Sequence, residues 1–421
     1  MRPETLSQFL KVGARMHTFA TALGLLRAPI FVALLAAAVL ILPGQSREIF
    51  QAIRETGGVD LLVEVARALA FVVLFSFALL GSCLLLIDAS PPSRKAATDL
   101  HRRLLEALAF AVALIPALAV GLATVNIFAF RRQSLGWIRV DLLICGLTVT
   151  FLAGIVALLA YYDKLNSAIL RRARLMYRPI SRLSVARGLI VVGALIVFLN
   201  TIIVIFPNEF ADWFGPVCVV LLFLTLLCLM SALLTYIYDR YQIPALALLA
   251  VAAVAWAIIG TNNNHQVRLG DERAPEPLDA PAAFSEWLQK RADLQEFAGR
   301  PYPVYLVTAE GGGLYAAAHA AWVLARIQDS CPVFARHVFA ISGVSGGSLG
   351  AAVFSALTKA YPSPRKLARE QKCSPEAVDS GPMQKAVRSY LREDLLTPLL
   401  AAGLFPDFFQ RFWPTPIQAF D

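Results

Sequence analysis

Residues 338–350 read VFAISGVSGGSLG, and this stretch decides how the C-terminal part of the chain folds. Its first four residues are apolar and typical of a short buried strand, while residues 351–359 are typical of a helix. Between them stands Gly343-Val344-Ser345-Gly346-Gly347, the pattern G-x-S-x-G, in which glycines flank a serine on a sharp strand-to-helix turn. Such a turn exposes the hydroxyl in front of the N–H groups that begin the helix, as a serine nucleophile requires.

The pattern occurs twice, because Gly346-Gly347-Ser348-Leu349-Gly350 overlaps the first copy. Ser345 directly follows the run 339–344, whereas Ser348 would need a strand that ends in two glycines. We therefore predict Ser345 as the nucleophile. The alternative is a glycine- and serine-rich turn that matches the pattern by composition alone.

A second glycine-rich turn lies one strand-and-helix unit upstream. Residues 304–308 read as a buried strand, and residues 314–328 read as a helix. Between them, Gly311, Gly312 and Gly313 leave the backbone without side chains, so that consecutive N–H groups can turn toward one point at a helix N-terminus. This loop suits an oxyanion hole. Phosphate-binding motifs are excluded, because neither turn spells G-x-G-x-x-G and no Lys-Ser or Lys-Thr follows.

Together, the sequence 310–313 (EGGG) and the later 343–347 (GVSGG) resemble the patatin-like phospholipase family, which is related to the cytosolic phospholipase A2 type. The resemblance implies a three-layer α/β module with a mostly parallel sheet. It also implies acylation of Ser345 by membrane lipids or other acyl esters, with Gly311, Gly312 and Gly313 holding the oxyanion. No cofactor and no metal is implied.

The chain departs from the family at several positions. The family usually has Asp where Glu310 stands, a basic residue where Tyr315 stands and often glycine where Ala316 stands. Without a base at Tyr315 a neutral or atypical acyl ester remains open as the substrate.

The family's second catalytic side chain is an aspartate in a later D-G-G or D-G-A motif, and no such motif occurs here. The aspartates after Ser345 are Asp379, Asp394, Asp407 and Asp421. His319 and His337 do not fall on the late loop where hydrolases place a histidine. We therefore expect a truncated module, impaired catalysis, and apolar side chains at 408–413 without partners. The aromatic run 404–413 is interpreted either as a lid or membrane-contacting rim or as part of the module's core.

Composition indicates a membrane protein. Of 421 residues, 58% are hydrophobic and only 16% are charged, far from the balance of a soluble globular protein. The net charge of +9 comes from bases that cluster between long apolar runs, and no nucleic-acid-binding module is visible.

Seven membrane spans are predicted, each about long enough to cross roughly 30 Å of hydrocarbon. They are placed at 25–43, 66–87, 104–128, 142–162, 189–206, 215–238 and 243–258. The seventh is short and rich in alanine, and a buried or interfacial helix is its alternative. Because ionisable residues are nearly absent at mid-depth, we interpret the spans as an anchor rather than a transporter.

Lysine and arginine gather in alternate loops: the N-terminal segment, the second loop at 94–103 and the fourth at 164–187. By the positive-inside rule the N-terminus is cytoplasmic, in a bacterial inner membrane, and the C-terminal module is exocytoplasmic. In an oxidising compartment Cys331 and Cys373 could form a disulfide, whereas two free thiols in the cytosol are the alternative.

The predicted organisation is a cytoplasmic segment 1–24, an all-α transmembrane bundle 25–260, a linker with an amphipathic helix 261–299, and the α/β module 300–421. The predicted function is a membrane-anchored lipid acyl hydrolase. A catalytically inactive lipid-binding or structural protein on the same anchor is the alternative.

Overall fold

The computed structural model describes residues 19–42, 58–89, 99–129, 182–260, 278–360, 373, 381–391 and 394–412. The chain forms two compact units. One comprises Met1–Gln266 together with Leu396–Asp421, and the other comprises Val267–Leu395. The C-terminal segment therefore belongs with the helical unit, a boundary different from the predicted module 300–421.

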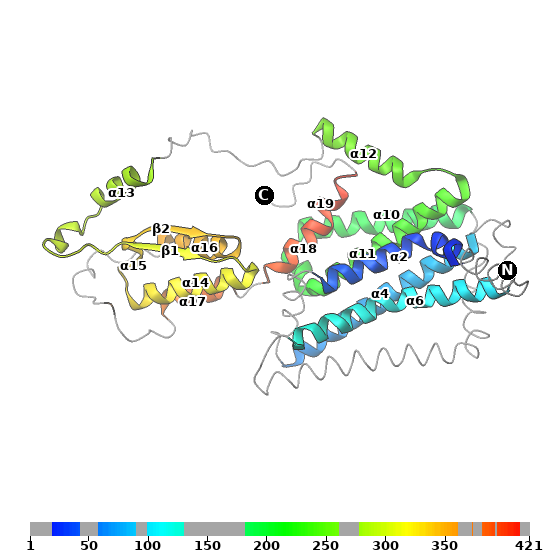
Figure 1. Cartoon of the computed structure of the whole chain (residues 1–421), viewed down its shortest axis with the longest axis horizontal. Helices are drawn as coiled ribbons and strands as arrows, with labels where there is room; N and C mark the ends of the chain where they lie inside the picture. Colours follow the sequence, from blue (N-terminus) through cyan, green and yellow to red (C-terminus); the bar gives the residue numbers. More distant parts are fainter. Residues whose placement is uncertain are drawn as a thin grey trace, which may run out of the picture. The chain divides into compact units, whose positions relative to one another are not determined.

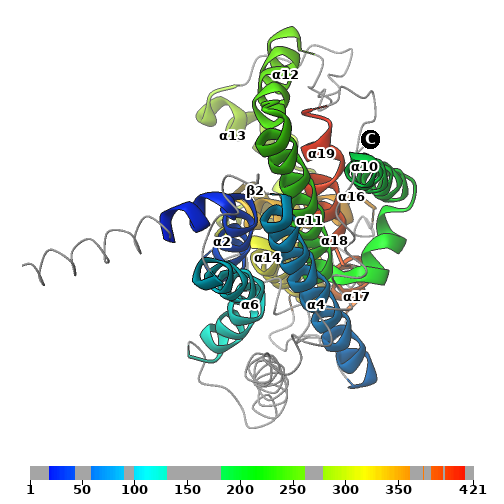
Figure 2. The same cartoon turned by 90° about the vertical axis from the view of Figure 1, so that its right-hand side faces the viewer.

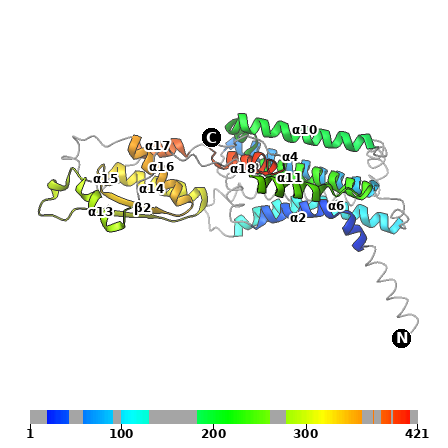
Figure 3. The same ribbon diagram turned by 90° about the horizontal axis from the view of Figure 1, so that it is seen from above.

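The first unit is a helical bundle (Figures 1, 2 and 3). Its helices are α2 (Arg27–Ile41), α4 (Gly58–Ala89), α6 (Asp99–Ala129), α10 (Arg182–Ile205), α11 (Pro207–Tyr241) and α12 (Ala245–Ile259). Most of α11 is buried, and its apolar side chains form one continuous core with α2, α4, α6 and α10. In contrast, α12 buries none of its residues.

Helices α4 and α11 run parallel. Arg67 Nη1 donates to the carbonyl oxygen of Asp212 at 3.3 Å in the first third of both helices, and further along both helices Cys228 Sγ donates to Ser82 Oγ at 3.4 Å. Close to the first contact, Gly215 has φ +69° at a kink in α11, and an added Cβ would lie 3.0 Å from a carboxylate oxygen of Glu64. Glycine is therefore favoured at this kink.

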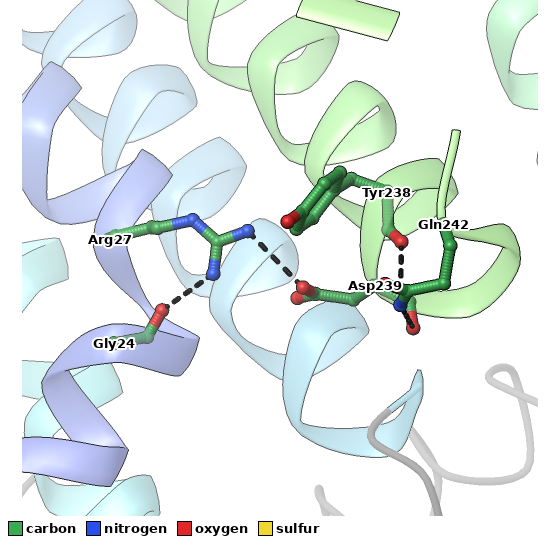
Figure 4. A network of polar contacts seen from close by, with 5 residues as sticks. All are labelled: Gly24, Arg27, Tyr238, Asp239 and Gln242. Atoms are coloured by element: carbon green, nitrogen blue, oxygen red, sulfur yellow. Dashed lines mark hydrogen bonds and ion pairs between the residues drawn. The ribbon is translucent and has the colours of Figure 1, made fainter. Parts of the chain in front are cut away.

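Helix α2 begins beside the end of α11 (Figure 4). Arg27 Nη2 lies 3.2 Å from Asp239 Oδ1, Nη1 donates to the carbonyl oxygen of Gly24 at 2.9 Å, and the guanidinium lies 5.6 Å from the centroid of the Tyr238 ring. These contacts hold the start of α2 to the end of α11. The start of α2 and the end of α11 consequently share one end of the bundle.

Four described helices are long and apolar enough to cross a membrane. They match the predicted spans at 66–87, 104–128, 189–206 and 215–238. The predicted span 25–43 corresponds to a pair of helices, Phe19–Leu25 and Arg27–Ile41, bent by 77° and counted as a fifth span if the pair crosses as one. The predicted span 243–258 corresponds to α12, which has only 15 residues, and the span 142–162 lies outside the described residues. A membrane protein is thus supported, with fewer described spans than the seven predicted.

The aromatic run near the C-terminus packs on the bundle through α18 (Leu396–Leu404) and α19 (Pro406–Phe409). Phe405 is fully buried, and the ring of Phe223 on α11 lies 5.9 Å from it and 5.1 Å from Phe408, both edge to face. The expectation that Phe408 lacks a partner is therefore wrong. The partner is a residue of the helical bundle, which neither interpretation of this run anticipated.

The second unit carries a small parallel sheet. Its elements are α13 (Ala280–Gln289), η2 (Leu294–Phe297), β1 (Tyr305–Ala309), α14 (Gly313–Ser330), α15 (Phe334–His337), β2 (Val338–Gly343), α16 (Gly346–Ala360) and α17 (Pro382–Tyr390). The strand–helix–strand order β1–α14–β2 makes the two strands parallel, as predicted for an α/β module. Within the described residues the sheet has these two strands.

The core of this unit lies between the sheet and helices α14, α16 and α17, where Ala321, Phe354 and Val387 are buried together. The Asp329 carboxylate at the end of α14 accepts hydrogen bonds from the backbone N–H groups of Met383 and Gln384, both at 2.9 Å. These two groups belong to the first turn of α17, which has no intrahelical acceptor for them. Asp329 therefore fastens α17 to α14.

Cys331, directly after α14, forms a disulfide with Cys373. The predicted pairing is thus present in the structure. It joins the end of α14 to the segment that precedes α17, beside the contact that Asp329 makes.

Candidate active site

The parallel register brings the two glycine-rich turns to one edge of the sheet. Thr308 pairs with Ser342 and Ala309 pairs with Gly343, so both strands end at the same level. The backbone N–H of Val344 donates to the carbonyl oxygen of Ala309 at 3.0 Å and extends the pairing into the turn. The loop that begins at Glu310 and the turn that holds Ser345 are consequently neighbours.

Ser345 stands in a left-handed backbone conformation, with φ +52°. It lies between the end of β2 at Gly343 and the start of α16 at Gly346, and it is exposed. Positive φ is uncommon for a residue other than glycine and is found where the surrounding structure enforces it. This conformation is the sharp strand-to-helix turn that G-x-S-x-G requires.

The glycines around Ser345 have no room for side chains. An added Cβ at Gly343 would lie 2.6 Å from Ser348 Cα, and one at Gly347 would lie 2.5 Å from the carbonyl oxygens of both Ala309 and Glu310. An added Cβ at Gly346 would meet the carbonyl group of Gly313. The turn is therefore held by backbone packed directly against backbone.

The triple-glycine loop passes in front of the serine. An added Cβ at Gly311 would lie 3.2 Å from Ser345 Cβ and 3.2 Å from the carbonyl oxygen of Val344. Gly312 and Gly313 have φ values of +153° and +65°, which glycine adopts most readily. Gly313 begins α14, whose first N–H groups have no acceptor within the helix, and the loop that leads into it contacts Ser345 at Gly311, an arrangement that suits the stabilisation of an oxyanion.

Ser348 occupies a different position from Ser345. It lies inside the first turn of α16, and its backbone N–H donates to the carbonyl oxygen of Ser345 at 2.9 Å. Its Cα and side chain fill the space beside Gly343. Of the two serines, Ser345 has the geometry of the elbow.

Apolar side chains around Ser345 are exposed. Val344 is 65% exposed, Leu349 on the first turns of α16 is 56% exposed, and Tyr315 on the first turn of α14 is 69% exposed. Exposed apolar groups beside a candidate nucleophile suit a substrate with an alkyl chain.

The two candidate histidines lie elsewhere. His319 is on α14, exposed, with its ring 6.5 Å from the ring of Tyr315. His337 precedes β2, whereas Ser345 follows that strand, and eight residues of extended chain separate them by roughly 20 Å or more. Asp379 and Asp421 lie outside the described residues, and Asp407 is on α19 in the helical unit. Asp394, at the end of the second unit, is exposed. The structure thus brings together the turn of the candidate nucleophile and the glycine loop.

His337 belongs to a buried cluster that the sequence did not reveal. Its Nε2 lies 3.2 Å from Asp293 Oδ2, at an angle poor for a hydrogen bond, and the Tyr302 hydroxyl donates to Asp293 Oδ1 at 2.8 Å. Burial lowers the pKa of His337 below its ordinary value, against the pull of the Asp293 carboxylate. Burial and Asp293 both raise the pKa of the Tyr302 hydroxyl. No local pattern could have joined Asp293 to His337.

Among the residues that the structure describes, His, Cys, Asp and Glu form no group that could hold a metal ion. Comparisons with family models, with curated proteins and with solved structures gave no match to this chain.

Proposed function

We propose that this chain is a membrane-anchored acyl hydrolase of the patatin-like type, acting through Ser345. The single observation that carries the proposal is Ser345 at φ +52° on a strand-to-helix turn, with the Gly311–Gly313 loop against its side chain. Strain of this kind at an exposed serine has a chemical use and no evident structural one.

The chemistry follows from the positions of these groups. The Ser345 hydroxyl attacks an ester carbonyl, its proton passes to a base, and N–H groups of the glycine loop receive the developing oxyanion. The base returns the proton to the leaving oxygen as the ester C–O bond breaks, and the acyl group stays on Ser345 Oγ. Water then gives a proton to the same base and attacks the acyl carbon, and the base passes that proton to Ser345 Oγ as the carboxylic acid leaves. These steps need the serine, the N–H groups of the glycine loop, a base and water.

The proposed substrate is a membrane lipid or another acyl ester. Support comes from the exposed apolar residues Val344, Leu349 and Tyr315 around Ser345, and from the apolar helices that keep the chain in a bilayer. Tyr315 is uncharged where the patatin-like family usually has a basic residue. This favours an ester whose alcohol part carries no negative charge.

The proposed orientation has the N-terminus in the cytoplasm and the α/β unit on the opposite side. Support comes from the parallel pairing of α4 with α11, because it puts the start of α2, the end of α4 and the start of α10 at one end of the bundle. In the sequence, each of these helix ends adjoins one of the three strongly basic regions. The Cys331–Cys373 disulfide supports an oxidising compartment for the unit.

Two more features bear on the number of crossings. By the same pairing, α6 ends at one end of the bundle and α10 begins at the other, so the chain between Ala129 and Arg182 has to join opposite ends. A crossing by residues 142–162 meets this requirement. An exocytoplasmic position of the α/β unit also requires that α12 crosses the membrane. At about 1.5 Å per residue the 15 residues of α12 span roughly 22 Å, which is shorter than a typical hydrocarbon core. The crossing therefore needs a locally thinned bilayer or a contribution from the residues that flank α12.

A fluorophosphonate probe tests the proposed chemistry, because it reacts irreversibly with an activated serine and accumulates even where turnover is slow. We expect labelling of the full chain at Ser345, its loss in Ser345→Ala, and its retention in Ser348→Ala. An adduct on Ser348 would overturn the assignment. Absence of any adduct in the folded chain would favour the inactive lipid-binding alternative, for which the missing D-G-G or D-G-A motif is the supporting observation.

The orientation has its own test. Alkaline phosphatase and green fluorescent protein are fused in turn after Arg300, and we expect phosphatase activity without fluorescence. The opposite pair of readings would place the unit in the cytoplasm.

A further inference from the structure

The segment that precedes β1 contacts β2 and the residues just before it through aromatic rings and polar groups. We define the strap as residues 280–300, which comprise α13 and η2. The strap residues Phe284 and Trp287 lie edge to face against Phe339 on β2, at ring distances of 5.2 and 5.4 Å. These aromatic contacts hold α13, none of whose own residues is buried.

The far end of the strap is held by a polar contact. Asp293 lies between His337, 3.2 Å from its Nε2, and the Tyr302 hydroxyl, 2.8 Å away. His337 is only 3% exposed, and the rings of Phe297 and Tyr302 stand edge to face against it at 5.7 and 5.1 Å. A histidine enclosed in this way cannot gain a proton without charge being placed among aromatic rings.

Within the part of the chain that the structure describes, the charged groups that act on His337 come from two places. Asp293 and Arg291 belong to the strap, while Arg336 is the neighbour of His337 in the chain. Arg291 Nη1 donates to the backbone carbonyl oxygen of Arg336 at 3.2 Å, so that it also ties the strap to the start of β2. The Asp293 carboxylate therefore favours the protonated imidazole, whereas the two guanidinium groups disfavour it.

We propose that this cluster is a proton-sensitive latch, in which protonation of His337 releases the strap from the amino end of β2. The strap precedes β1 in the chain and contacts β2, the strand whose other end carries Ser345, so release would free the amino end of β2 from α13 and η2. In the proposed exocytoplasmic location the latch would sense the pH outside the cell.

The direction of the effect follows from linkage. Because burial lowers the pKa of His337 in the docked state, the free strap binds the proton more tightly than the docked one. Docking is therefore fully stable above the ordinary histidine value near 6.5 and weakens as pH falls from there to the lowered pKa. Over that window the opening constant rises by at most about tenfold per pH unit, the limit for one proton.

Hydrogen exchange of the full chain in lipid nanodiscs, read by mass spectrometry, measures this opening. Exchange of peptides from 280–300 is recorded from pH 7.5 to pH 4.5 and corrected for intrinsic rates with α14 as the internal reference. We expect opening of the strap to increase severalfold on acidification while α14 stays protected. Equal protection of the strap at all pH values would overturn the proposal.

Variants separate the latch from general acid sensitivity. His337→Gln should remove the pH dependence, and the matched control His319→Gln, at an exposed position on α14, should keep it. Asp293→Asn should enlarge the increase at low pH, because Asp293 favours the proton on the docked histidine. If His337→Gln does not fold, Asp293→Asn decides: an unchanged or smaller increase contradicts the latch. Because exchange is read without substrate, the result does not depend on whether Ser345 is catalytic.

Discussion

The helical bundle and the α/β unit achieve close packing in different ways. In the bundle an added Cβ at Gly193 on α10 would meet nothing within 4 Å, and at Gly188 it would make only ordinary contact with Leu233. In the α/β unit an added Cβ at Gly343 or Gly347 would run into backbone at 2.5–2.7 Å. Side chains therefore carry the packing of the bundle, whereas the candidate active site relies on backbone atoms in direct contact. The same substitution should have opposite consequences in the two regions.

The largest effect should come from a side chain of the bundle. Phe405 is fully buried against Phe223, so Phe405→Ala should cost about 3–5 kcal/mol of unfolding free energy. Unfolding of the purified chain in mixed micelles with a rising fraction of SDS measures this loss. Leu399→Ala, at a position 59% exposed on α18, is the matched control and should change it by less than about 0.5 kcal/mol. Equal losses in both variants would show that burial of the Phe405 ring does not stabilise the bundle.

A methyl group added at the elbow should rank second. Gly347→Ala places a carbon 2.5 Å from the carbonyl oxygens of Ala309 and Glu310, and the forced shift should cost about 1–3 kcal/mol. Loss of probe labelling at Ser345 and faster exchange in β2 would report it. Gly193→Ala makes the same change in open space and should be neutral or slightly stabilising. If both variants behave alike, the proposed contrast between the two regions fails.

A smaller effect is expected where one carboxylate holds two helices together. Asp329→Ala leaves the N–H groups of Met383 and Gln384 without their acceptor and should cost about 0.5–2 kcal/mol, as for loss of a helix cap. Hydrogen exchange of residues 381–391 measures the loosening of α17. Asp279→Ala removes the exposed cap of α13, where Asp279 accepts from Ala282, and should leave α17 unchanged. Loosening of α17 in the control would assign the effect to global destabilisation.

Local patterns in the sequence predicted the elements of both units. The two strands appear at 305–309 and 338–343, each followed by the expected glycine turn and helix, and Ser345 occupies the turn. These predictions succeed because a strained turn needs glycines at fixed offsets, which the sequence displays directly. The apolar runs likewise specify helices whatever their neighbours are.

Contacts between distant residues were not predictable in this way. Phe405 meets Phe223 on α11, and Asp329 caps a helix that begins 53 residues later, at Pro382. The 77° bend between the helices at 19–25 and 27–41 was missed as well, because this run is apolar on both sides of the break and hydropathy reports no direction. Such features depend on which surfaces of the protein contact each other, and the periodicity of a single segment does not predict its partner.

The return of α18 to the bundle also constrains the order of synthesis. The side chains of α10 and α11 that α18 covers emerge from the ribosome before Val267, yet Leu396 follows only after the entire second unit has been translated. At elongation rates of roughly 5–20 residues per second this delay is on the order of ten seconds. During that interval Phe223 lacks its ring contacts with Phe405 and Phe408. The bundle therefore completes this part of its core only after α18 and α19 have been synthesised.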